Sequence, residues 1–149
     1  MKVFRGSIFD CPNSNYIVIP TNLIVRKDGL AVMGAGLALQ AAQLYPELPI
    51  LLGKHLTRTK DTFPIWFKFK DKTIICFATK HDWKDKASIS LIQDNIISLT
   101  TTVLLEDWKN IAIPKLGAGL GQLQWNTIKP IMEQLLDNNY ILCLNENNA

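Results

Sequence analysis

Hydrophobic positions along the chain fall into short runs that alternate with longer amphipathic segments. Runs rich in Val, Ile, Phe and Tyr, bounded by turn residues, are typical of strands. They cover residues 2–6, 16–20, 63–69, 73–78, 110–114 and 140–144. Helical signals occur over residues 36–44, 90–105 and 127–136. The chain is therefore predicted to alternate strands with helices over most of its length.

The segment 90–105 has the clearest helical period, because its apolar residues recur at steps of three and four. Ser90 and Gln93 match the spacing of a capping box at its start. The segment 127–136 carries a similar stripe, and Pro130 is expected in its first turn, where a missing amide proton costs little. Pro46 should end the helix 36–44, and Pro49 should lie in the following loop or the first turn of the next element.

The continuous apolar runs indicate how the elements pack. A strand such as 110–114, which is apolar at nearly every position, needs cover on both faces of its sheet. We therefore predict an α/β fold, a three-layer α/β/α sandwich with a central mixed sheet. The sequence contains no repeats or linker-like stretches, so residues 1–149 are predicted to form one domain.

Composition indicates the class of protein and the compartment in which it is expected. Hydrophobic residues make up 48% and charged residues 19% of the chain, which is the profile of a globular protein. No apolar run reaches the roughly 18 to 20 residues of a membrane span. Cys76 and Cys143 lie in apolar runs and are expected to be buried free thiols, which suggests a reducing, cytoplasmic setting, or the host cytoplasm for a viral protein. His55 and His81 are too isolated to suggest a metal site.

Two glycine-rich segments carry the candidate chemistry. The first, residues 31–38, reads AVMGAGLA and leads into the helix 36–44. Glycines let a ligand approach the backbone, and unpaired amides at a helix N-terminus bind anions. A glycine turn used for tight helix–sheet packing is the alternative. The pattern is not a dinucleotide-binding fingerprint, since the third glycine and the later acidic residue are missing.

The second segment, residues 114–125, reads PKLGAGLGQLQW and lies between a predicted strand and a predicted helix. Ligands of α/β folds bind at this edge, beyond the carboxyl ends of the strands. The segment is not a P-loop, because no lysine followed by Ser or Thr closes it. Together the two loops suit a diphosphate held from both sides by backbone amides, without a metal. The net charge of +3 permits such an anionic ligand.

The order of these motifs resembles that of macrodomains, across nearly the whole chain. The matching segments are 6–9 (GSIF), 21–22 (TN), 32–38 (VMGAGLA), 78–80 (ATK) and 113–120 (IPKLGAGL). The details are most similar to the subgroup that contains the terminal ADP-ribose protein glycohydrolase and the antitoxin DarG. The resemblance implies a hydrolase that removes ADP-ribose from a target, without a cofactor.

The resemblance also implies the residues of the site. Asn22 would orient the distal ribose, and Ser7 and Ile8 would lie beside the adenine, although macrodomains often carry Asp where this chain has Ser7. The ligand-binding set carried over from the family is Ser7, Ile8, Asn22, Met33, Gly34, Ala35, Gly36, Thr79, Leu116, Gly117, Ala118, Gly119, Leu120 and Gly121. Lys80 and Asn22 form the catalytic set.

Lys80 corresponds to the nucleophile of the family. A neutral amine that attacks the anomeric carbon would expel the attached group and leave an iminium that water resolves. A solvated surface lysine is the alternative for this residue type. Trp125 is expected to buttress the second loop. His81 would face away from Lys80 on an extended strand, whereas a loop would leave a role in proton transfer open.

One departure from the family bears on the substrate. Where the protein-directed glycohydrolase has an acidic residue in the second loop, this chain has Gly121, as DarG-type loops do. This difference favours DNA as the target, and the resemblance implies that the ADP-ribose is linked to thymidine. The alternatives are a non-catalytic ADP-ribose reader or sponge, and a hydrolase of protein-linked or small ADP-ribose derivatives. A monomer that does not contact membranes is expected.

Overall fold

The computed structural model describes residues 1–59, 61–82, 84–118 and 121–145. The strands are β1 (Lys2–Arg5), β2 (Tyr16–Thr21), β3 (Ile65–Phe69), β4 (Lys72–Ala78), β5 (Ile111–Ile113) and β6 (Tyr140–Leu144). The helices are α1 (Gly36–Leu44), α2 (Leu48–Arg58), α3 (Ile89–Glu106) and α4 (Trp125–Leu135), with a short 3-10 helix, η1 (Ile8–Asp10). None of the helices in these ranges is long and apolar enough to cross a bilayer.

The strands form one six-stranded sheet in the order β1-β6-β5-β2-β4-β3. β3 pairs antiparallel with β4, and every other neighbouring pair is parallel. The predicted mixed sheet is confirmed, with small shifts at the strand ends. Because β2, β4 and β5 run parallel, their carboxyl ends meet at one edge of the sheet, and the loops that follow them lie there together.

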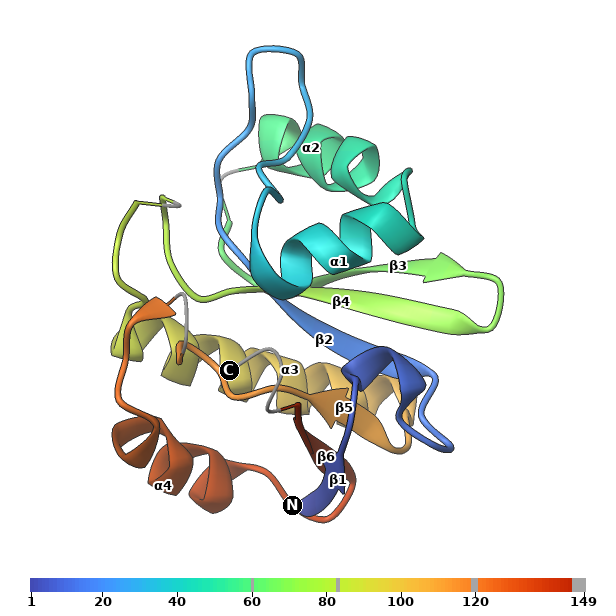
Figure 1. Ribbon diagram of the computed structural model, residues 1–149, viewed down its shortest axis with the longest axis vertical. Coiled ribbons are helices and arrows are strands. Elements are labelled where there is room, and N and C mark those ends of the chain that lie inside the picture. The colour runs from blue at the N-terminus through green and yellow to red at the C-terminus, as the bar shows by residue number, and fades with distance from the viewer. Residues whose placement is uncertain (60, 83, 119–120, 146–149) are drawn as a thin grey trace.

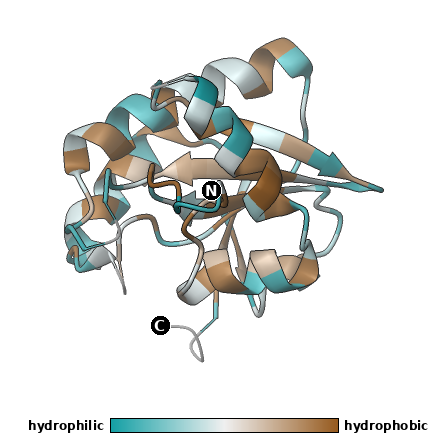
Figure 2. Ribbon diagram, turned by 90° about the horizontal axis from the view of Figure 1, so that it is seen from above, coloured by the Kyte–Doolittle hydropathy of each residue, from teal (hydrophilic) through white to brown (hydrophobic). Residues whose placement is uncertain are grey.

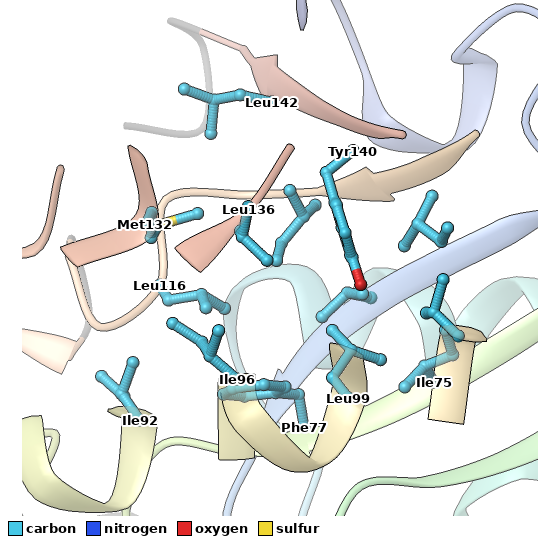
Figure 3. Packing of buried hydrophobic residues seen from close by; sticks show 14 of the residues in the cluster. Ile75, Phe77, Ile92, Ile96, Leu99, Leu116, Met132, Leu136, Tyr140 and Leu142 are labelled. Atoms are coloured by element: carbon cyan, nitrogen blue, oxygen red, sulfur yellow. The ribbon is translucent and has the colours of Figure 1, made fainter. Parts of the chain in front are cut away.

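Helices cover both faces of the sheet, so the predicted three-layer sandwich is confirmed (Figure 1). Alternate residues of β4 point to opposite faces. Ile75 and Phe77 pack with α3 and α4, as Figure 3 shows, whereas Ile74 and Cys76 pack with α1 and α2. Figure 2 shows the strands of the middle layer mostly hydrophobic and the helices mixed. The sheet is therefore buried between two layers of helices.

The structure corrects the predicted helices at three points. Helix α2 was not predicted. Pro49, expected in a loop or in the first turn of the next element, lies within the first two residues of α2, where proline fits. The predicted capping box at Ser90 is wrong, since Ser88 caps α3 by accepting from the Leu91 amide at 3.2 Å. Pro130 lies beyond the first turn of α4, which begins at Trp125. Burial of Ile128 and Met132 holds that helix despite the proline.

The Tyr140 hydroxyl is buried in the cluster of Figure 3 and has no hydrogen-bond partner among the described residues. Burial raises the pKa of this phenol, so it stays neutral at physiological pH. We expect Tyr140→Phe to leave the free energy of unfolding unchanged or to raise it by about 1 kcal/mol, because the change removes an unsatisfied polar group. Urea unfolding measures this. A clear loss of stability would mean that the hydroxyl has a partner.

Candidate functional site

The loops after β2 and β4 are joined at the carboxyl edge of the sheet. The Thr79 amide donates to the Thr21 carbonyl at 3.1 Å, and the Leu23 amide donates to the His81 carbonyl at 3.0 Å. These bonds continue the β2–β4 pairing beyond the ends of both strands. Asn22 and Lys80, the two predicted catalytic residues, are therefore placed on neighbouring loops.

The side chain of Asn22 organises its own loop. Its Nδ2 donates to the Val32 carbonyl at 3.3 Å, and its Oδ1 accepts from the Ile24 amide at 3.0 Å. A carboxamide has a second N–H and a second acceptor lone pair, so contact with a ribose hydroxyl remains chemically available. The geometry assigns Asn22 a structural role, and its predicted ribose contact stays a prediction.

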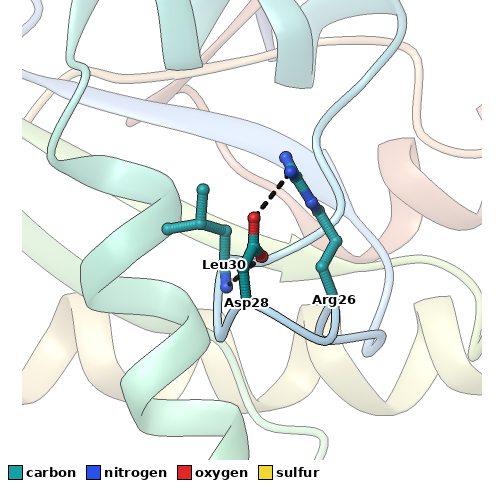
Figure 4. Close-up of polar contacts among 3 residues, drawn as sticks. All are labelled: Arg26, Asp28 and Leu30. Atoms are coloured by element: carbon teal, nitrogen blue, oxygen red, sulfur yellow. Dashed lines mark hydrogen bonds and ion pairs between the residues drawn. The ribbon is translucent and has the colours of Figure 1, made fainter.

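Residues 24–32 form a hairpin-like loop that leads from β2 to the first glycine segment. Val25 and Ala31 form an isolated bridge. At the tip, Arg26 pairs with Asp28 at 2.6 Å, and Asp28 also accepts from the Leu30 amide at 3.2 Å (Figure 4). This loop is tied to α2 by the Ala31 amide, which donates to the Pro49 carbonyl at 2.9 Å.

Gly53 of α2 lets the helix touch this loop. A Cβ at Gly53 would lie 2.0 Å from the Gly29 carbonyl oxygen and 2.9 Å from the Ala31 nitrogen. Alanine normally stabilises a helix relative to glycine, by about 1 kcal/mol. Here we expect Gly53→Ala to lower the free energy of unfolding by about 2–3 kcal/mol, because backbone must move. Denaturant unfolding measures the change, with Lys54→Ala, at an exposed neighbour, as the control. Stabilisation by Gly53→Ala would contradict the close packing.

The first glycine segment ends as the N-terminus of α1. Ala35 is the N-cap, and it offers no side-chain cap to the first amides of the helix. Gly34, Ala35 and Gly36 are exposed, and Gly36 has a φ of +60°, a conformation that favours glycine. Met33 is buried in the core beneath them. The arrangement leaves uncapped amides and the positive end of a helix dipole facing solvent, which suits an anion.

The second glycine segment follows β5. Leu116 and Gly117 are buried and Ala118 is half-buried. Gly117 has a φ of +76°, and a Cβ there would lie 2.8 Å from side-chain atoms of Ile92 and Leu123. Glycine is therefore required for both conformation and space. Gly119 and Leu120, also predicted to bind ligand, lie outside the described residues.

Gly121 also has a packing role. Its carbonyl accepts from the Ala87 amide at 2.9 Å, and a Cβ at this position would lie 3.1 Å from the Ala87 Cβ. A side chain would therefore press on the loop that joins β4 to α3. Trp125 begins α4, and its ring lies 5.4 Å from the Lys115 ammonium nitrogen. This contact supports the predicted buttressing role of Trp125.

The two residues predicted beside the adenine follow β1. The Ser7 hydroxyl accepts from the Phe9 amide at 3.3 Å and caps the short helix η1. The Ile8 side chain is buried in the same core cluster as Met33 and Ala41 of α1. The structure thus gives both side chains local structural roles, and their contact with a ligand stays a prediction.

The backbone that precedes Lys80 is held from two sides. The Thr79 carbonyl accepts from the Ser88 amide at 2.8 Å, and the Ala78 carbonyl accepts from Asn95 Nδ2 at 2.9 Å. Lys80 itself is half-buried, and His81 is exposed in the loop beyond the strand. Asn95 was missed by the sequence reasoning. Its signal was a polar residue on the apolar stripe of the helix, beside Ile96, where an unpaired amide would be costly.

A hollow opens beside Asn22. It is lined by the ends of β2 and β4, by α2 and by the segment before β3, and its residues include Thr21, Asn22, Leu23, His55 and Cys76. Burial raises the pKa of the Cys76 thiol to about 12. A thiolate nucleophile is therefore not available there at neutral pH. The sequence analysis did not predict this hollow or the contribution of α2 to it.

Comparison with known proteins relates the chain to macrodomains both by a family model and by an individual relative. The Macro domain family model matches residues 66–132. The DNA ADP-ribosyl glycohydrolase of Mycobacterium tuberculosis is 30% identical over 106 residues, which are 67% of this chain and 30% of that protein. The chain thus spans about a third of the length of this relative.

Solved structures extend the likeness to the whole fold. The macrodomain of Mycobacterium tuberculosis DarG has a TM-score of 0.81 and 25% identity, with 96% of each chain covered. Thermosipho africanus DarTG, solved in complex with ADP-ribose, has a TM-score of 0.84 and 22% identity, over 99% of this chain and 43% of that one.

Proposed function

We propose, from the premise that this chain belongs to the macrodomain family, that it binds ADP-ribose and hydrolyses it from DNA. One observation carries the proposal. The Thr79–Lys80 segment follows β4, the buried turn at Leu116–Gly117 follows β5, and the loop after β2 leads to the uncapped start of α1. The carboxyl ends of these three parallel strands share one edge of the sheet. This arrangement supports an anion cradle and an amine at the edge where ligands of α/β folds bind.

The diphosphate would lie between the two glycine segments. The first amides of α1 donate to one side of it, and the helix dipole favours its negative charge. The turn around Gly117 would approach from the other side, because it follows β5 at the same edge of the sheet. Backbone amides hold the ligand in this scheme, so binding requires no metal.

The distal ribose would then lie beside Asn22, with Lys80 on the adjacent loop. The neutral amine of Lys80 attacks the anomeric carbon, and the bond from that carbon to the base breaks. The base leaves with the electron pair and takes up a proton. Water then adds to the anomeric carbon and releases both ADP-ribose and the lysine. The half-buried position of Lys80 and the fixed backbone before it favour this orientation.

The choice of DNA as the target rests on two supports. The relative from Mycobacterium tuberculosis reported above is named for activity on DNA. In addition, this chain carries no carboxylate at Gly121, where the resemblance puts one in the protein-directed branch. Separately from the substrate, the close contact with Ala87 gives a packing reason for a glycine at position 121.

The test is an incubation with an ADP-ribosylated oligonucleotide and, separately, with an ADP-ribosylated protein, followed by chromatography for free ADP-ribose. Release from the oligonucleotide is expected. Faster release from the protein would contradict the DNA assignment. Tight binding of ADP-ribose without release from either substrate would identify the chain as a reader.

A further inference from the structure

A second hollow extends the site away from the glycine segments. It is lined by His55 in the last turn of α2, by residues 61, 63 and 64 before β3, and by residues 65 and 66 at the start of β3. It shares His55, Asp61 and Phe63 with the hollow beside Asn22. Because β3 runs antiparallel to β4, the start of β3 lies toward the carboxyl end of β4, where Lys80 follows. The two hollows are therefore continuous with the site.

The walls of this hollow combine an aromatic face with polar groups. Phe63 is 64% exposed, which is unusual for so large an apolar side chain. His55 Nε2 lies 3.9 Å from Asp61 Oδ1, and the hydroxyl of Thr59 donates to the other oxygen of Asp61 at 2.8 Å. The polar groups are thus held in place before any ligand arrives.

The volume of this second hollow and the charges beside it indicate which kind of ligand it could hold. The hollow has a volume of about 290 Å³, at the small end of ligand pockets, which span roughly 300–1,000 Å³. A single planar ring system fits this size better than a whole nucleotide. Lys54 and Arg58, on the same stretch of α2 as His55, are exposed and positively charged, so they attract a phosphate backbone rather than a basic partner.

We propose that this hollow, next to Asn22 and lined by His55, Asp61 and Phe63, holds the nucleobase to which the ADP-ribose is attached. The base stacks on Phe63, as single-stranded nucleic acids stack on exposed aromatic rings. His55 and Asp61 offer a donor and an acceptor to its edge. The inference rests on the proposed function, because it places the leaving group of that reaction beside the anomeric carbon.

Phe63→Ala tests the inference by binding, in a Lys80→Ala background that prevents turnover. Calorimetry compares free ADP-ribose with an ADP-ribosylated oligonucleotide. We expect the background protein to bind the oligonucleotide more tightly than free ADP-ribose. Phe63→Ala should weaken oligonucleotide binding by about tenfold or more, the size of a base–aromatic stack. Affinity for free ADP-ribose should stay within about twofold, because the diphosphate is held elsewhere.

Two further variants sharpen the comparison. Phe63→Tyr keeps a stacking face and should retain oligonucleotide affinity, whereas Leu104→Ala, at an 81% exposed position on α3, should change neither ligand. Unchanged oligonucleotide affinity in Phe63→Ala, or an equal loss for free ADP-ribose, would overturn the base pocket. If the background protein binds neither ligand, the proposed function itself fails.

Discussion

Lys80→Ala is expected to lower turnover of an ADP-ribosylated oligonucleotide by about 100-fold or more, because loss of a nucleophile removes the reacting group. Affinity for ADP-ribose should change only a few fold, since backbone amides hold the diphosphate. Lys80→Arg should be equally inactive, because a guanidinium stays protonated and cannot attack. Single-turnover kinetics and calorimetry measure the two quantities separately.

The control for this variant is Lys86→Ala, which removes an exposed lysine from the same loop. It should retain turnover, so a loss specific to Lys80 is not explained by net charge. Mass spectrometry of the wild-type protein with substrate should also show a transient ADP-ribosyl adduct on Lys80. Turnover that survives in Lys80→Ala would exclude lysine as the nucleophile.

Gly34→Glu is expected to weaken ADP-ribose binding by about 100-fold or more without disturbing the fold. A Cβ at Gly34 meets no atom within 4 Å, so the side chain fits. A carboxylate there would face the bound diphosphate, and two like charges about 4 Å apart repel by about 4 kcal/mol at an effective dielectric near 20. Calorimetry measures the affinity, and thermal unfolding checks the fold.

Gly34→Gln separates charge from bulk, because it adds a side chain of the same shape without the negative charge. It should bind ADP-ribose more tightly than Gly34→Glu does. Leu104→Glu places the same charge on the exposed surface of α3 and should leave affinity unchanged. Wild-type affinity in Gly34→Glu would exclude the start of α1 as a phosphate site.

The sequence alone predicted the mixed sheet and helices on both of its faces, although it missed α2. Strands that are apolar at nearly every position, such as β5, have only one stable environment, between two layers, so the α/β/α sandwich follows from local pattern. Glycine-rich segments after strands likewise marked the carboxyl edge of the sheet as the candidate site. Lys80 was identified only through the resemblance to a family, because a lone lysine carries no distinctive pattern.

Only the tertiary structure decided the roles that depend on neighbours distant in sequence. Helix α2 escaped prediction because Pro49 is compatible with both a loop and the first turn of a helix, and no helix was assigned after it. Gly53 gives no sign in the sequence that the backbone of Gly29 lies against it. The bond from Asn95 to the Ala78 carbonyl, and the hollow that Phe63 lines, depend on how α3 and the approach to β3 pack beside β4. Local propensity predicts elements, but a pocket is made by long-range packing, which brings together residues whose spacing in the sequence carries no signal.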